Sequence, residues 1–259
     1  MPATLRQVNS QGRADQRRRL ERLRAQLARL DRSERAGTGP ILALPFAGIE
    51  RALPGGGLAR GALHELCGAP EQAAAAGFAA VLLGRLAADG HVVWIGPRDE
   101  LYGPGLLELG LDPARLIVVR ARGRDARLWA LEEALRSPGL VAALAEVDRL
   151  TLTQSRRLQL AAEAKGVTGF LLRPTAAGQV PSAAFTRWRI EALAGAGEGG
   201  PGRRDLGPPC WQVELFRCRG GRPGSWRIAW VAGGWHEVAD PVALAAEPVD
   251  RPAARVRPA

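Results

Sequence analysis

Hydrophobic and polar positions alternate along this chain in a way that predicts a repeated strand–helix unit. Short, nearly continuous apolar runs are typical of parallel strands covered on both faces, and each of them except the last is followed by a longer segment that predicts a helix. The expected strands are 62–67, 91–95, 115–119, 140–145 and 167–172, and the expected helices are 73–88, 101–109, 124–135 and 153–165. This order predicts an α/β fold with a mainly parallel sheet, right-handed crossovers and helices on its faces.

A different pattern begins after Pro174. Residues 185–193, 211–218 and 226–231 alternate apolar and polar side chains without helices between them. This pattern predicts antiparallel strands added to an edge of the sheet. The Gly- and Pro-rich stretch 195–209 is expected to be a loop, and residues 241–259 a disordered tail.

A basic segment, residues 14–35, precedes the core and predicts an N-terminal helix with a narrow apolar stripe. Such a helix is expected to dock on the body of the protein or on a partner, and DNA contact is the alternative. Its candidate contact positions are Arg17, Arg18, Leu20, Arg22, Leu23 and Leu27. The chain therefore divides into the basic helix and linker (1–38), a core domain (39–240) and the tail (241–259).

Composition adds a bias in charge. The 259 residues carry a formal net charge of +10, which favours acidic partners and nucleic acid among them, although an arginine-rich composition alone also produces it. No apolar run reaches the roughly 18 residues that a membrane-spanning helix needs, and no secretion signal is evident. We expect a cytoplasmic protein with no membrane contact, for which association with the nucleoid is compatible with the charge. Cys67, Cys210 and Cys218 lack C-x-x-C spacing, which indicates buried thiols and no metal site.

The turn between the first expected strand and its helix has the position of a phosphate-binding loop but not its residues. A P-loop reads G-x-x-x-x-G-K-S/T, in which the lysine meets the phosphates and the hydroxyl holds Mg²⁺. After Gly68, the second glycine, the lysine and the hydroxyl residue are replaced by Ala73, Ala74 and Ala75. Glu71 adds a charge that repels phosphate, and the chain's single lysine lies far from this turn. We expect no bound cofactor here.

Several segments resemble a known family. Residues 56–61 (GGLARG) and 107–116 (LELGLDPARL) are similar to segments of RecA recombinases. A closer likeness, to the ImuA-like branch, is carried by 61–65 (GALHE), 76–79 (AGFA), 94–97 (WIGP) and 155–163 (SRRLQLAAE). The resemblance covers about residues 47–235 and implies a RecA-like core. It also implies a role in damage-induced translesion synthesis, beside an inactive Y-family polymerase homologue and an error-prone C-family polymerase.

ATPases of the RecA type need two further acidic groups, and this chain offers poor candidates for both. In an ungapped comparison, the position of the glutamate that polarises water falls at Arg98. Glu146 or Asp148 could stand for the metal-binding acid, but a solvated loop acid is the plainer interpretation. The three histidines are expected in the core or at strand edges. We therefore expect no catalytic residues and no ATP hydrolysis.

The C-terminal strands combine tryptophan with arginine. A strand with one buried and one wet face produces this pattern, whereas a protein interface or a single-stranded nucleic-acid site are the alternatives. Family analogy implies partner contact in this region. The candidate positions are Arg187, Arg189, Trp211, Arg217, Arg219 and Trp226.

Together these features predict a non-catalytic adaptor that works through protein contacts. By resemblance, its partners are the Y-family polymerase-like subunit and the C-family polymerase, with a recombinase filament and a weak DNA contact as further candidates. Two alternatives stay open: a divergent RecA-type DNA-dependent ATPase, and a RecA-like inhibitor of cell division in the SOS response.

Overall fold

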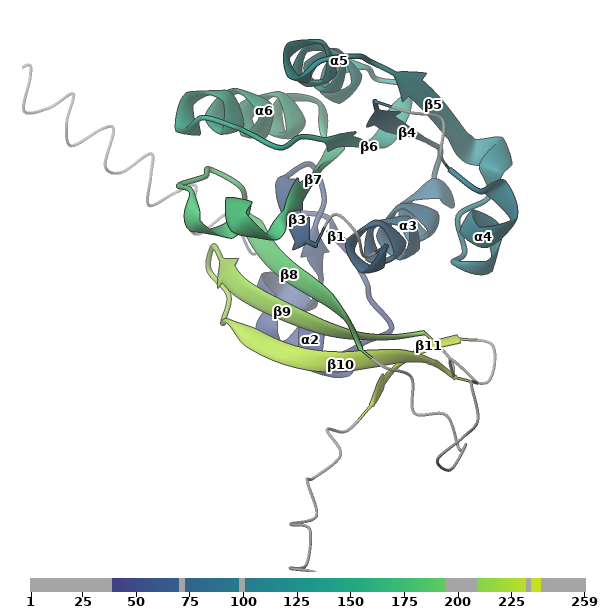
Figure 1. Cartoon of the computed structure of the whole chain (residues 1–259). Helices are drawn as coiled ribbons and strands as arrows, with labels where there is room; N and C mark the ends of the chain where they lie inside the picture. The colour runs from purple at the N-terminus through teal and green to yellow at the C-terminus, as the bar shows by residue number, and fades with distance from the viewer. Residues whose placement is uncertain (1–38, 70–72, 98–100, 194–208, 232–233, 239–259) are drawn as a thin grey trace, which may run out of the picture.

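A nine-stranded sheet forms the centre of the molecule (Figure 1). The structure is a computed structural model that describes residues 39–69, 73–97, 101–193, 209–231 and 234–238. Across the sheet the strands follow the order β11-β10-β9-β8-β3-β7-β6-β4-β5. The expected N-terminal helix, the C-terminal tail and nearly all of the expected loop 195–209 lie outside the described residues.

Six neighbouring strands of this sheet run parallel to one another. They are β3 (Leu63–Gly68), β4 (His91–Gly96), β5 (Leu116–Arg120), β6 (Leu140–Glu146), β7 (Thr168–Pro174) and β8 (Thr186–Leu193). Three antiparallel strands follow, β9 (Cys210–Cys218), β10 (Gly224–Val231) and β11 (Gly234–Val238).

The prediction of an antiparallel strand at 185–193 was wrong. β8 pairs with β3 in parallel and with β9 antiparallel, so the sheet changes direction one strand later than expected. The connection from β7 to β8 contains only the 3₁₀ turn Thr175–Gln179. Because no helical pattern marks this connection, the crossover is not visible in the sequence.

Helices cover both faces of the parallel part (Figure 1). One face packs against α3 (Ala74–Ala87) and α4 (Gly103–Glu108), with Leu66 and Trp94 in its core. The other packs against α5 (Arg124–Arg136) and α6 (Leu152–Lys165), with Leu63 and Val93 in its core. Successive strand residues point to opposite faces, so each strand contributes to both cores.

The α6 helix is defined at both ends by local sequence. Thr151 and Gln154 form a reciprocal capping box at its start, and Gly166 ends it in the left-handed conformation. The side-chain oxygen of Gln159 accepts a hydrogen bond from the backbone N–H of Leu63 at 2.9 Å. This contact ties α6 to the first core strand.

A small N-terminal layer packs beside the antiparallel strands. It contains α2 (Ala47–Ala52), the 3₁₀ turn Pro54–Gly56, and a two-stranded sheet of β1 (Ile41–Leu42) and β2 (Leu58–Ala59). A further 3₁₀ turn, Pro113–Arg115, precedes β5. Strands of two residues are too short for periodicity to reveal. None of the described helices has the length and apolar character needed to cross a bilayer.

Candidate functional site

The end of β3 meets the first turn of α3 through apolar packing. A Cβ atom on Gly68 would lie 2.5 Å from the Cβ of Ala75 and 3.2 Å from the carbonyl oxygen of Ile190. Strand and helix therefore touch at a place where only glycine fits. Ala74 and Ala75 are each 4% exposed. The two positions at which a P-loop carries its lysine and its hydroxyl thus hold buried methyl groups.

Trp211 of β9 covers the first turn of α3. A Cβ on Gly77 would lie 2.7 Å from the indole of Trp211, which also stacks on Trp235 with ring centroids 4.0 Å apart. Trp211, one of the candidate contact positions, is buried in the core, which agrees with the interpretation of a strand with one buried face. Ala73 precedes the helix and is exposed, with no side-chain cap, and Glu71 lies outside the described residues.

Glu146, at the carboxyl end of β6, is held by its neighbours. Its Oε1 accepts a hydrogen bond from the indole N–H of Trp94 at 2.8 Å, and its backbone oxygen accepts one from Arg127 at 2.6 Å. The interpretation as a solvated loop acid is therefore wrong for Glu146, which is half-buried, whereas Asp148 is exposed. Arg98, which falls at the position of the glutamate that polarises water, lies outside the described residues.

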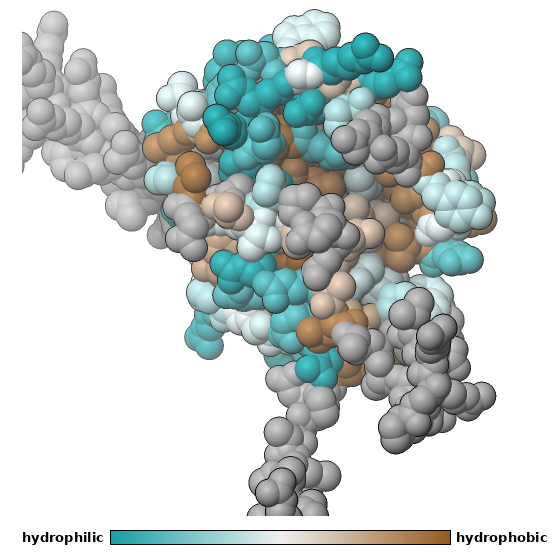
Figure 2. Space-filling view, in the orientation of Figure 1, coloured by the Kyte–Doolittle hydropathy of each residue, from teal (hydrophilic) through white to brown (hydrophobic). Residues whose placement is uncertain are grey.

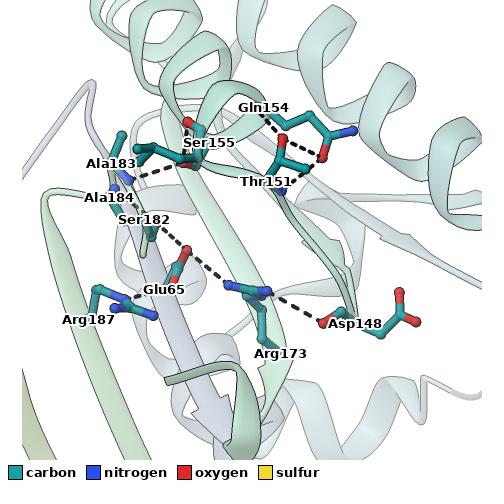
Figure 3. Close-up of polar contacts among 11 residues, drawn as sticks. Glu65, Asp148, Thr151, Gln154, Ser155, Arg173, Ser182, Ala183, Ala184 and Arg187 are labelled. Atoms are coloured by element: carbon teal, nitrogen blue, oxygen red, sulfur yellow. Dashed lines mark hydrogen bonds and ion pairs between the residues drawn. The ribbon is translucent and has the colours of Figure 1, made fainter. Parts of the chain in front are cut away.

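A buried carboxylate, Glu65, lies in the middle of β3 on the face covered by α6 (Figure 3). Its Oε2 accepts a hydrogen bond from Nε of Arg187 at 2.8 Å, and its Oε1 accepts from Nη1 of Arg173 at 3.3 Å and from the hydroxyl of Ser182. All three partners are themselves buried. Arg173 also donates to the backbone oxygen of Asp148, whose carboxylate points away from the cluster (Figure 3).

This arrangement is suited to holding strands together rather than to catalysis. Both oxygens of Glu65 are occupied, and its side chain has no exposed surface. The two guanidinium groups come from β7 and β8, the two strands that flank β3. Sequence reasoning did not single out Glu65. The available signal was an acid inside an apolar strand, but its partners lie 108 and 122 residues further along the chain.

His64 occupies the opposite face of β3. Its Nε2–H donates to the backbone oxygen of Ala59 at 2.8 Å, and its Nδ1 accepts from the hydroxyl of Thr186 at 2.7 Å. That hydroxyl in turn accepts from the indole N–H of Trp188 at 2.6 Å. Burial lowers the pKa of His64 to about 4, although the hydrogen bond to Ala59 opposes the shift. The prediction of a core histidine is confirmed, and this one is neutral at pH 7.

Comparison with known proteins shows which family this chain belongs to. Two curated relatives, both called Protein ImuA and both from Caulobacter vibrioides (strains NA1000 / CB15N and ATCC 19089), are 46% identical to this chain over 202 residues. The match covers 72% of this chain and 82% of each relative. The chain belongs to the ImuA family. No protein-family model matches it.

In this ImuA family member, the predicted C-terminal contact residues have different surroundings. Arg187, a candidate contact position, is buried and forms an ion pair with Glu65. Arg189 is half-buried and forms an ion pair with Glu214. Trp226 is also half-buried. Arg217 is exposed, and Arg219 is half-buried with its guanidinium 5.7 Å from the ring centroid of Phe185.

The contact residues predicted in the basic helix, Arg17 to Leu27, lie outside the described residues. The three thiols are unpaired, as expected. Burial raises the pKa of Cys67 to about 11, with Glu65 adding to the shift, and this ImuA-type chain therefore keeps that thiol protonated at neutral pH. Within the described residues no group of side chains could hold a metal ion.

Proposed function

We propose that this ImuA family member is a non-catalytic adaptor in DNA-damage-induced translesion synthesis. The observation that carries the non-catalytic part is the apolar start of α3. There Ala74 and Ala75 are buried where phosphoryl-transfer ATPases of this class place a lysine and a hydroxyl. A methyl group can neither neutralise phosphate charge nor bind Mg²⁺. A transferring phosphoryl group would lack its main stabilising contacts.

Membership of the ImuA family supports the pathway. By the resemblance set out above, the partners are an inactive Y-family polymerase homologue and an error-prone C-family polymerase, and a RecA-like body offers these partners a rigid scaffold. A RecA filament is a further candidate partner, through residues 1–38. The strand order, with its parallel strands followed by an antiparallel edge, is compatible with a RecA-like core.

The first experiment tests the partners. The full chain is co-expressed with the Y-family polymerase homologue and the C-family polymerase of the same genome, and the complex is analysed by size-exclusion chromatography with light scattering. We expect a stable complex that contains the homologue. Deletion of the gene is expected to abolish the rise in mutation frequency after ultraviolet damage. Wild-type mutagenesis in the deletion strain would contradict the proposal.

The second experiment tests for catalysis. Isothermal titration calorimetry with ATP and Mg²⁺, and a phosphate-release assay with single-stranded DNA, are expected to show no tight site and no turnover. Release above background that disappears in Glu146→Gln would instead support a divergent DNA-dependent ATPase. Glu133→Gln, on the exposed surface of α5, is the matched control.

A further inference from the structure

A groove runs along the outer side of α6 and has no role in the proposal above. It lies between α6, the segment 181–184 before β8, and the end of β9, and its volume is about 800 Å³. We call it the α6 groove and define it by Leu152, Arg156 and Leu160 on the helix and Ala183, Arg217 and Arg219 opposite. Figure 2 shows apolar and polar side chains mixed along this edge of the molecule.

The wall opposite the helix is held in place by hydrogen bonds. The backbone N–H of Ala183 donates to the hydroxyl of Ser155 at 3.0 Å, and that hydroxyl donates to the backbone oxygen of Leu152 at 2.9 Å. Ser182 donates a hydrogen bond to the buried Glu65 (Figure 3). Arg219 donates one to the backbone oxygen of Ala183 at 3.2 Å. A groove with fixed walls binds a ligand at a lower entropy cost than a mobile surface.

The charge of the groove is positive. Three arginines line it, against one acid, Glu163, which already accepts a hydrogen bond from Gln159 at 2.8 Å. Arg156 and Arg217 are exposed, and neither forms an ion pair with any residue that the structure describes. Two guanidinium groups facing one groove favour a carboxylate-bearing ligand, because bidentate arginine–carboxylate contacts are strong and directional.

The helix side of the groove is also apolar. Leu152 and Leu160 are 44% and 49% exposed, and Arg156 lies midway between them. Residues spaced by four share one face of a helix, so the helix presents an apolar–cationic–apolar stripe that spans about 12 Å. Such a stripe matches about four residues of an extended peptide or two turns of a helical one. A nucleic-acid backbone has no apolar group to place against the leucines.

We propose that the α6 groove binds a short acidic segment of a partner protein, with a carboxylate between the arginines and apolar side chains against Leu152 and Leu160. This inference rests on the adaptor function for its biological setting. The two proposals can fail independently. The peptide selection tests only the groove, and the co-expression experiment tests only the adaptor function.

The test begins with a selection that needs no named partner. The full chain is immobilised and screened against a phage-displayed random library of peptides of about 12 residues, long enough to span the stripe in either conformation. We expect enriched peptides with net negative charge and apolar residues on both sides of an acid. No enrichment, or enrichment of basic or uncharged peptides, overturns the proposal.

The most enriched peptide is then labelled with fluorescein and titrated by fluorescence anisotropy. Arg156→Glu and Arg217→Glu are each expected to weaken binding about tenfold or more, and Leu160→Ser about fivefold, since charged and apolar contacts both contribute. The matched controls are Arg115→Glu and Leu107→Ser, exposed residues near the β5 edge of the sheet, and they should change the affinity less than about twofold. Equal affinity of wild type, Arg217→Glu and Leu160→Ser overturns the proposal.

A competition experiment separates protein from nucleic acid. An oligothymidylate of about 20 nucleotides, longer than a typical single-strand site, is added to the labelled complex. We expect it to displace the peptide only weakly. If the oligonucleotide displaces the peptide efficiently, and its own affinity falls in both arginine variants but not in Leu160→Ser, the groove is a nucleic-acid site and the proposal is wrong. Thermal unfolding followed by circular dichroism confirms that each variant is folded.

Discussion

Two sites on β3, only three positions apart, have opposite chemical character: one is apolar and the other is ionic. At Gly68 the strand meets α3 at the methyl group of Ala75, which occupies the sequence position of the hydroxyl residue in a P-loop. At Glu65 the same strand buries a carboxylate with two guanidinium groups. Ala74 and Ala75 thus bring no charge to the start of α3, whereas a charged cluster joins β3 to β7 and β8. The difference indicates that the buried ions of β3 hold strands together, whereas the contact at Gly68 is one of close packing.

The largest expected effect comes from removing the charge of Glu65. Glu65→Gln leaves Arg173 and Arg187 buried without their carboxylate, and breaking a buried ion pair in this way costs about 3–5 kcal/mol. Urea unfolding followed by tryptophan fluorescence measures the change. The same replacement at the exposed Glu133, which pairs with Arg136, should cost less than about 1 kcal/mol. Similar losses in the two variants would show that the cluster does not hold the strands.

The second effect concerns His64, on the other face of the strand. Its pKa of about 4 in the folded chain lies below the ordinary value of 6.5, so the unfolded chain binds a proton that the folded chain does not. Stability from this group is complete above about pH 6.5 and is lost as the pH falls toward 4, by on the order of 3 kcal/mol in all.

The measurement is urea unfolding of the wild type and His64→Gln between pH 7.5 and pH 5. The other titrating groups are common to both proteins, so the difference between the two profiles isolates the histidine. We expect the wild type to lose about 2 kcal/mol more than the variant over this range. Parallel profiles would mean that the pKa of His64 is not lowered in the folded state.

A third, intermediate effect is expected at the contact between Gly68 and Ala75. Gly68→Ala places a methyl group against Ala75 and should cost about 2 kcal/mol through overpacking. Ala75→Gly costs about 1 kcal/mol, because glycine weakens a helix. In the double variant the clash is absent, so the two costs should not add. Additive free energies of unfolding would show that the turn has room, and with it space for a ligand.

The smallest expected effect lies at the start of α6, the helix above Glu65. Thr151→Ala removes the capping box and should cost about 1 kcal/mol. Thr153, two residues later, is exposed inside the first turn, and Thr153→Ala is the control, with less than about 0.5 kcal/mol expected. Thermal unfolding of both variants shows whether the loss of stability comes from the cap or only from the change in helix propensity.

Much of the parallel core could be predicted because its strands are continuous apolar runs between helical segments, as at 91–95 and 140–145. The direction of β8 could not, since alternation of apolar and polar residues is the same in both kinds of pairing. Trp211 and Arg187 were candidate contact positions because of their residue types, whereas their burial depends on which strand lies alongside. The absence of a lysine after Gly68 is visible in the sequence itself, but the close approach of Ala75 to Gly68 depends on how α3 packs against β3.

The order of synthesis adds a consequence to the position of Glu65. The ribosome completes β3 long before β7 and β8, because Arg173 and Arg187 follow 108 and 122 residues later. At ordinary translation speeds this interval lasts on the order of ten seconds. Throughout it the nascent strand has neither of its neighbours, and its edges are open to other chains. A negative charge in an otherwise uncharged segment discourages such pairing, so we expect the carboxylate to lower the tendency of the strand to aggregate before it binds the two arginines.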